Sequence, residues 1–340
     1  MQEGGFCSSG DLRRGHLPED RRSNGRTADS PVEVYSIMLT IFGLPKPFQG
    51  HIGVIQRNAI TSWTCLRPQP EVILFHKEEG TEEVARELGV RYVPDVRCNE
   101  FGTPLLDDMF AKAREMATHP IMCYANADML FLSDFMNAVE RVASWRNRFL
   151  MAGRRTYFDL DELVDFETPD WEVRLRALVS KQGVLGPPNG IDYFVFPQNL
   201  ELNMPPFAIG RPYWDNWFLW KARSLKIAVV DASRIVLAIH QNHDYAHNPQ
   251  GIVGIFRGEE GQGHLRMVGR ERMYTVDDAT HVVTPEGIKG NGGRLFLQII
   301  KRQWAALMRK SMPIRHRLGI RRDRLERLAS LFRETGDTRK

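Results

Sequence analysis

The sequence has few cysteines and no long apolar run, and each absence narrows the class of protein. Its four cysteines, Cys7, Cys65, Cys98 and Cys123, are widely scattered and form no Cys-x-x-Cys pair. This excludes a standard redox or zinc-finger motif and a dense disulfide framework. No segment reaches the roughly 20 apolar residues of a membrane-spanning helix, and residues 1–31 lack the apolar core of a secretory signal. The sequence therefore favours a cytoplasmic protein with reduced thiols.

The net charge is also small, at +4 over 340 residues. This balance does not require a polyanion, so we expect no nucleic-acid partner. The positive charge is concentrated near the C-terminus, in Arg302, Arg309, Lys310, Arg315, Arg317, Arg321, Arg322 and Arg324. Two alternatives remain open for this part: basic amphipathic helices that make peripheral contact with a membrane surface, or helices that pack on the domain.

What is present indicates a globular core, because 42% of the residues are hydrophobic. We divide the chain into four parts by composition. Residues 1–31, rich in Gly, Ser, Asp and Arg, are expected to be a disordered leader. Residues 32–250 form the main domain, 251–293 a loop-rich segment dominated by glycine and charge, and 294–340 a basic helical tail broken at Pro313.

The main domain alternates strand-like and helix-like runs. Strands are expected at 34–42, 71–77, 90–96, 121–128, 148–153, 191–196, 226–231 and 234–240, and helices at 50–66, 81–89, 104–118, 134–145, 170–181 and 213–224. Thr81 is the expected N-cap of the second helix and Gly89 its end. The alternation predicts an α/β fold with a mostly parallel sheet flanked by helices.

One strand ends unusually, in the stretch YANADMLFLSDF at 124–135. Ligands of open parallel sheets bind beyond the carboxyl ends of the strands, where Asn126 and Asp128 are expected to lie. Their oxygens suit one divalent cation. An unpaired buried carboxylate costs several kcal/mol, so a cation or strong donors should accompany Asp128. Asp134 is expected to cap the next helix.

The segment 213–224 offers a candidate base. Burial beside tryptophans raises the pKa of an acid such as Asp215, while the start of a helix lowers it. Asp192, at the end of another strand, is the rival base. The aromatic residues are too dense for one buried face, so some are expected to line a cleft for a sugar ring: Trp214, Trp217, Phe218 and Trp220.

A histidine cluster and an arginine complete the candidate residues. His240, His243 and His247 follow a predicted strand and are compatible with a metal site, although their spacing matches no standard zinc signature. A zinc hydrolase built on them is one alternative function. Arg154 and Arg155 follow the strand at 148–153, and a guanidinium can bind a diphosphate bidentately. Of the two, we assign Arg154 to the donor.

The order of strands, the segment NEFGTPLLDDMFAKA and the strand ending YANAD resemble nucleotide-sugar-dependent glycosyltransferases of the GT-A fold, of a family 2-like type. The resemblance covers roughly residues 35–247. It implies transfer of a sugar from a nucleotide diphosphate-sugar to a saccharide or other hydroxyl acceptor. It also implies Mg²⁺ or Mn²⁺, and we favour inverting chemistry. This sequence departs from the family's Asp-x-Asp motif, because Asn126 occupies the first acidic position.

The resemblance assigns roles around the donor. Asp128 becomes the main metal ligand, and Asn126 contacts the donor ribose or a metal-bound water. His240 or His243 completes the shell of the cation or contacts the diphosphate. Because asparagine is neutral, the expected metal site has one negative charge fewer than an Asp-x-Asp motif would give it.

The same resemblance assigns the base and nucleotide pocket. Thr40 and Phe42 would line the nucleotide base and ribose. The family's aromatic-acid-acid-aromatic helix start matches WDNW, where Asn216 replaces the second acid and leaves Asp215 as the base. A sugar-phosphate nucleotidyltransferase and a degenerate nucleotide-sugar binding module remain alternatives.

Overall fold

The computed structural model describes residues 38–243 and 251–318, and the expected leader at 1–31 lies outside them. Its larger sheet has the order β13-β12-β10-β6-β9-β4-β1-β2-β3. These strands are β1 (Leu39–Gly43), β2 (Glu71–Phe75), β3 (Arg91–Val93), β4 (Ile121–Ala125), β6 (Phe149–Ala152), β9 (Tyr193–Pro197), β10 (Ala228–Asp231), β12 (His281–Thr284) and β13 (Gly287–Gly290). Most neighbouring strands are parallel, and β9 and β13 run antiparallel to theirs. The expected mostly parallel α/β sheet is confirmed.

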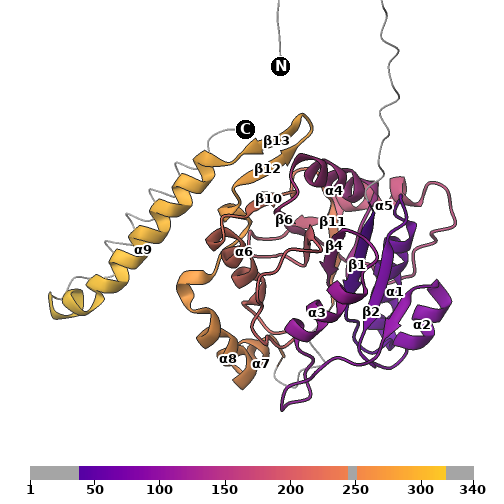
Figure 1. Cartoon of the computed structure of the whole chain (residues 1–340), viewed down its shortest axis with the longest axis horizontal. Coiled ribbons are helices and arrows are strands. Elements are labelled where there is room, and N and C mark those ends of the chain that lie inside the picture. The colour runs from indigo at the N-terminus through magenta and orange to yellow at the C-terminus, as the bar shows by residue number, and fades with distance from the viewer. Residues whose placement is uncertain (1–37, 244–250, 319–340) are drawn as a thin grey trace, which may run out of the picture. The chain divides into compact units, whose positions relative to one another are not determined.

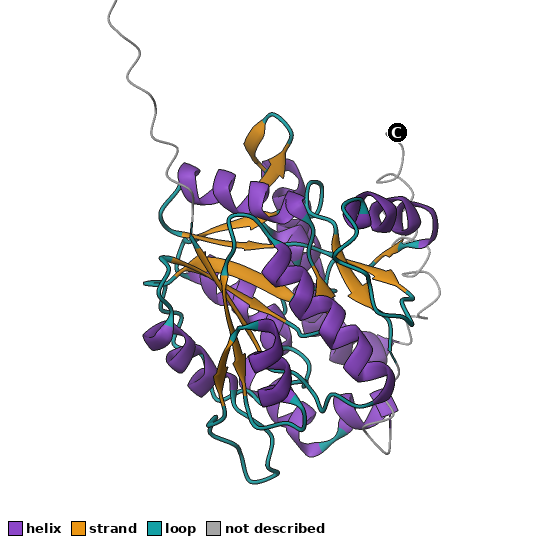
Figure 2. Cartoon of the chain, turned by 90° about the vertical axis from the view of Figure 1, so that its right-hand side faces the viewer, coloured by secondary structure: helices purple, strands orange, loops and turns teal. Residues whose placement is uncertain are grey.

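Helices cover both faces of this sheet (Figures 1 and 2). The helices of the first part are α1 (Gly50–Cys65), α2 (Thr81–Leu88), α3 (Leu106–Met116), α4 (Ser133–Trp145), α5 (Trp171–Gln182) and α6 (Trp214–Ser224). Alternate residues of a strand point to opposite faces. In β4, Met122 and Tyr124 therefore pack with α3 and α6, whereas Cys123 packs with α1 and α4. Burial on both faces explains why these strands are almost wholly apolar.

A smaller sheet brings distant segments together at the edge of the larger one. It contains β5 (Met129–Leu130), β11 (Ala238–Gln241), β7 (Arg155–Phe158) and β8 (Val184–Leu185), in that order. The antiparallel pairing of β5 with β11 sets His240 opposite Met129. The end of β11 thus lies beside the turn that follows β4.

Two of the expected helix caps are wrong, and one helix end is confirmed. Helix α2 begins at Thr81, but its N-cap is Gly80 in the left-handed region, and the Thr81 hydroxyl has no partner among the described residues. Gly89 ends α2 at a φ of 64°. Asp134 lies within the first turn of α4 instead of capping it, because its Oδ2 accepts a hydrogen bond from Arg176 of α5 at 2.5 Å.

The segment 251–293 is not loop-rich as expected. It contains α7 (Gly251–Arg257), α8 (Glu259–Val268), the 3₁₀ turns η1 (Arg270–Arg272) and η2 (Val276–Asp278), and the hairpin β12–β13. Several of its glycines stand at element ends, as Gly269 does after α8. His264 anchors α8 because its Nε2 accepts a hydrogen bond from the Ala208 amide at 2.9 Å.

The helix α9 (Gly292–Leu318) follows the hairpin and does not end at Pro313 as expected. A proline removes one helical hydrogen bond, which a long helix tolerates as a local bend. None of the helices described here, α9 included, has the length and apolar character needed to cross a bilayer.

Candidate active site

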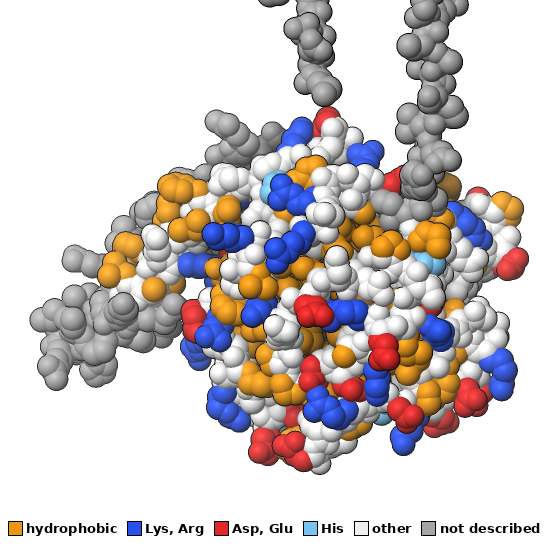
Figure 3. Space-filling model, viewed as in Figure 1, with side chains coloured by type: hydrophobic (Ala, Val, Ile, Leu, Met, Phe, Trp, Pro, Cys, Tyr) orange, Lys and Arg blue, Asp and Glu red, His pale blue; other side chains and the backbone are white. Residues whose placement is uncertain are grey.

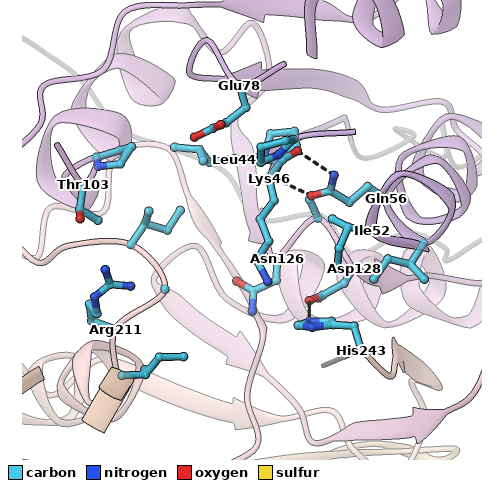
Figure 4. Close-up of a pocket in the computed structure, with 18 of the residues that line it drawn as sticks. Leu44, Lys46, Ile52, Gln56, Glu78, Thr103, Asn126, Asp128, Arg211 and His243 are labelled. Carbon is cyan, nitrogen blue, oxygen red and sulfur yellow. Dashed lines mark hydrogen bonds and ion pairs between the residues drawn. The ribbon is translucent and has the colours of Figure 1, made fainter. Parts of the chain in front are cut away.

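A pocket of about 420 Å³ opens at the carboxyl ends of β1 and β4 (Figure 4). The loop after β1, helix α1, the turn after β4 and the end of β11 contribute to its wall. Its lining residues include Leu44, Pro45, Lys46, Pro47, Ile52, Gln56, Tyr124, Asn126, Asp128, Arg155, Arg211, His240 and His243. The pocket therefore lies at the edge where ligands of open α/β sheets bind.

The loop after β1 is held by Gln56 of α1. The Gln56 Oε1 accepts from the Lys46 amide at 2.6 Å, and its Nε2 donates to the Lys46 carbonyl at 2.8 Å. The Lys46 side chain extends from this loop toward Asn126 (Figure 4). Sequence reasoning missed both residues, although a lysine between two prolines directly after a buried strand is a usable signal.

Asn126 connects the turn after β4 to Asp192. Its Nδ2 donates to Asp192 Oδ1 at 3.0 Å, and its backbone amide donates to the Asp192 carbonyl at 2.9 Å. Its Oδ1 accepts from the Tyr124 hydroxyl at 2.8 Å. Both polar atoms of the Asn126 side chain thus have a partner, and Asn126 borders the pocket as expected.

Asp128 lies between two histidines from the end of β11. Its Oδ2 is 3.1 Å from His243 Nε2, and its Oδ1 is 3.4 Å from His240 Nδ1. One donor atom from each of the three residues fits within 4.8 Å of the others. Figure 4 shows Asp128 and His243 directed toward each other at the pocket wall. The fold thereby assembles three of the residues expected to bind metal.

Two atoms of this cluster are weakly satisfied. Asp128 Oδ1 and His240 Nδ1 are both buried and face each other at 3.4 Å, but neither makes a well-formed hydrogen bond to a described residue. Buried polar atoms are normally satisfied. Burial opposes the charged form of Asp128, yet His240 and His243 outweigh it and hold its pKa well below the usual range. An anionic oxygen and two imidazoles are a suitable donor set for a divalent cation.

Asp192 is also buried and is paired with Arg155 of β7. Arg155 Nη1 lies 2.6 Å from Asp192 Oδ2, and its Nη2 donates to the Tyr157 hydroxyl at 2.7 Å. Asp192 Oδ2 is in addition 3.6 Å from His240 Nδ1. The two candidate acids Asp128 and Asp192 therefore flank the same imidazole.

Arg154 is not in the pocket, which corrects the expectation. Its Nε donates to the Gly186 carbonyl at 2.7 Å, and its backbone amide donates to the Ser233 hydroxyl at 2.8 Å. Arg154 lies in the loop between β6 and β7, whereas β7 begins at Arg155. Arg155, the next residue, is the one that lines the pocket.

Asp215 lies in the first turn of α6, close to the charges of Asp192 and Arg155, and is not among the residues that line the pocket. Burial raises the pKa of Asp215 to about 7, and Asp192 acts in the same direction against the neighbouring backbone N–H groups. Asn216 points elsewhere, because its Nδ2 donates to the Tyr274 carbonyl at 2.8 Å. An acid with a pKa near neutrality is suited to accept a proton.

The aromatic residues of α6 do not form the expected aromatic face of a cleft. Trp214, Trp217 and Phe218 are buried in the core between α6 and the sheet. Trp220 is partly buried, and the guanidinium of Arg272 lies 4.8 Å from its ring centre. The dense aromatic pattern arises because α6 packs on the sheet, on α8 and on η1 at once.

Thr40 and Phe42 are likewise buried away from the pocket. The Thr40 hydroxyl donates to Glu71 at 2.7 Å, at the amino end of β2. Phe42 is fully buried against Phe75 and Phe110. The nucleotide-lining role expected of Thr40 and Phe42 is therefore wrong, since β1 continues past them to Gly43.

His247 lies outside the described residues, so the three-histidine cluster is assessed on His240 and His243. Sequence reasoning also missed Tyr124 and Arg211 as pocket residues. Tyr124 carried no signal, because a tyrosine within an apolar strand is typical of core. Arg211 lies in an irregular stretch whose course only the fold defines.

No protein-family model matches the chain, and no curated protein matches it. Solved structures do resemble it. Glucosyl-3-phosphoglycerate synthase from Mycobacterium tuberculosis aligns over 70% of this chain and 81% of that one, with 14% identity and a TM-score of 0.42. The mannosyltransferase PcManGT from Pyrobaculum calidifontis, in complex with GDP-Man and Mn²⁺, aligns over 61% and 57%, with 15% identity and a TM-score of 0.37.

TarS from S. aureus aligns over 60% of this chain and 60% of that one, with 8% identity and a TM-score of 0.42. Likeness at this level is loose, so the chemistry of this chain rests on its own residues.

Proposed function

We propose that this protein is a glycosyltransferase that moves a sugar from a nucleotide diphosphate-sugar to an acceptor hydroxyl with the help of a divalent cation. One observation carries the proposal. Asp128, mostly buried and paired with His240 and His243, presents a three-residue donor set within 4.8 Å at a pocket on the carboxyl edge of a mostly parallel sheet. A pocket of about 420 Å³ lies in the size range of small-molecule sites.

Asp128, His240 and His243 would hold Mn²⁺ or Mg²⁺. When bound, the cation would neutralise the charge that develops on the leaving diphosphate. Lys46, Arg155 and Arg211 line the pocket together with Glu78. Arg155 is paired with Asp192 and Arg211 with Glu260, so these guanidiniums would contact an anionic donor through their remaining N–H groups. Asn126 is better suited to position Asp192 than to ligate the metal, because its amide already donates to that carboxylate.

Asp215 is the proposed base. A pKa of about 7 leaves a substantial ionised fraction near neutral pH, and that fraction can accept the proton of the attacking hydroxyl. Asp192 is the weaker candidate because Arg155 and Asn126 already donate to its oxygens. Attack assisted by a base on the side opposite the diphosphate would invert the anomeric carbon.

A zinc hydrolase is the second candidate, favoured by the donor set itself. One carboxylate and two imidazoles with an open position are also typical of catalytic zinc. Zinc in the purified protein, lost together with hydrolytic activity in His243→Ala, would support it.

The test is a thermal-shift screen of the full chain against UDP-, GDP- and dTDP-sugars, with and without Mn²⁺. We expect at least one donor to raise Tm only when Mn²⁺ is present. Asp128→Asn should abolish that shift, while the exposed control Asp161→Asn should retain it. Absence of stabilisation by every nucleotide would overturn the transferase proposal.

A further inference from the structure

Helix α9 contacts the rest of the domain through polar side chains. Arg302 donates to both oxygens of Asp278, at 3.0 and 2.6 Å, and Gln298 Nε2 donates to Asp277 Oδ2 at 3.2 Å. Arg294 Nε lies 3.5 Å from Asp277 Oδ1. Arg294, Gln298 and Arg302 are four residues apart, so they occupy one side of the helix. This polar side faces η2 and the sheet.

The opposite side of α9 is apolar and exposed. Phe296, Ile300, Trp304 and Leu307 follow helical spacing, and their exposed fractions are 62%, 45%, 54% and 58%. Figure 3 shows hydrophobic side chains gathered along α9. Helices of globular proteins normally turn their apolar side inward. In α9 the arrangement is reversed, and the described residues leave this side uncovered.

The charge of the region suggests the partner. Between Gly292 and Leu307 the helix has no acidic residue, and of its three basic residues Arg294 and Arg302 are paired with acids of the domain, which leaves Lys301. The following stretch, 308–327, is rich in arginine, and its only acids are Asp323 and Glu326. An anionic surface would neutralise this charge. A second copy of α9 packed against the apolar side would instead bring like charges together.

We propose that α9 lies in the interfacial layer of a bilayer that contains anionic lipids. Its apolar side, formed by Phe296, Ile300, Trp304 and Leu307, would enter the boundary between headgroups and acyl chains, as interfacial amphipathic helices do. Tryptophan suits this depth because its ring is apolar and its N–H is polar. The polar side of α9 would remain attached to the domain and hold it at the membrane. This binding is independent of the proposed transferase activity.

The experiment is vesicle co-sedimentation of the full chain. The vesicles are phosphatidylcholine alone and phosphatidylcholine mixed with phosphatidylglycerol. We expect binding to the mixed vesicles, weakened by high salt. The triple variant Phe296→Ser, Ile300→Ser, Trp304→Ser should lower the partition constant by more than about 10-fold, because it removes three apolar side chains that the bilayer would bury.

A matched triple variant controls for the general loss of exposed apolar surface. Leu163→Ser, Val173→Ser and Val184→Ser remove three side chains that are 62%, 68% and 64% exposed elsewhere. This control should bind like the wild type. Failure of the wild type to bind anionic vesicles, or equal binding by both triple variants, would overturn the proposal. A dimer in sedimentation velocity that only the α9 variant loses, without vesicle binding, would assign the apolar side to self-association.

Discussion

Among the single residues, Asn126 stands where the resemblance expects an acid, and its contacts give a physical reason for the amide. Its Nδ2 donates to Asp192 at 3.0 Å. A carboxylate at this position would lie against the Asp192 carboxylate and repel it. Asp192 thus supplies the second negative charge near His240, from a different strand. Asp192 therefore provides the negative charge that an acid at position 126 would have provided.

Asp215→Asn should lower turnover by about 10²- to 10⁴-fold, the range that a general base contributes. Wild-type activity should rise as pH increases through about 7, because only ionised Asp215 accepts a proton. The measurement is the pH dependence of sugar transfer. The exposed control Asp170→Asn should match the wild type. Full turnover in Asp215→Asn would exclude it as the base.

Stability offers a readout of Asp215 that needs no substrate. The folded pKa of Asp215 is raised, so the neutral acid's contribution to stability is complete at acid pH and is lost as pH rises through about 7. Asparagine cannot ionise, so Tm of Asp215→Asn should exceed that of the wild type above pH 7 and approach it at acid pH. An equal difference at every pH would contradict the raised pKa.

Among the elements, strand β1 shows how the sheet defines the position of the site. Its side chains, Phe42 included, are buried, and the pocket begins only with the loop from Leu44 to Pro47. Gly43 permits close packing at the strand end, because a Cβ there would lie 2.5 Å from the Ala125 carbonyl oxygen. The chain therefore leaves the sheet beside the turn that carries Asn126.

Phe42→Ala should lower the free energy of unfolding by about 3–5 kcal/mol, the usual cost of removing a buried phenylalanine. Its ring contacts Phe75, Phe110 and Tyr124 in the core. Nucleotide affinity of the folded fraction should stay unchanged. Denaturant unfolding and calorimetric titration measure the two quantities, with half-exposed Met38→Ala as control. Lost affinity with intact stability would restore Phe42 to the donor pocket.

At the scale of the whole described chain, α9 is attached to the rest of the domain through the buried carboxylate of Asp278. Asp278 is almost fully buried, and Arg302 supplies its counter-charge. Removing one partner of a buried ion pair costs about 3–5 kcal/mol because the other charge remains uncompensated. The position of α9 therefore depends on a few polar contacts more than on apolar packing.

Arg302→Met should lower the free energy of unfolding by somewhat less than about 3–5 kcal/mol, because Arg302 is partly exposed and solvent screens its charge. It should also increase amide hydrogen exchange in residues 292–302. Lys301→Met, the exposed neighbour, is the matched control. Adding Asp278→Asn should restore part of the loss, since it removes the uncompensated charge. Unchanged exchange in α9 would show that its attachment does not depend on Arg302.

The periodicity of the sequence determined helices α1–α6 and most strands up to β11, because alternating strand-like and helical runs depend on local preferences and on burial. It did not indicate β5, β7 and β8, which are short and belong to the smaller sheet. It also determined that Asn126 and Asp128 follow a buried strand, which placed them at the ligand-binding edge. Caps and glycine-rich segments were less predictable, as Asp134 and the segment 251–293 show, because tertiary partners such as Arg176 and Ala208 bind side chains there.

Only the tertiary structure decided which side chains meet. The pairing of β11 with β5 brings His240 to Asp128 across more than a hundred residues, and β7, which begins at Arg155 and pairs with β11, places Arg155 and not Arg154 at the pocket. Strand pairing is a long-range property that local spacing does not contain. The sequence by itself determined the kinds of group and the edge of the sheet, whereas the packing of the strands determined the site.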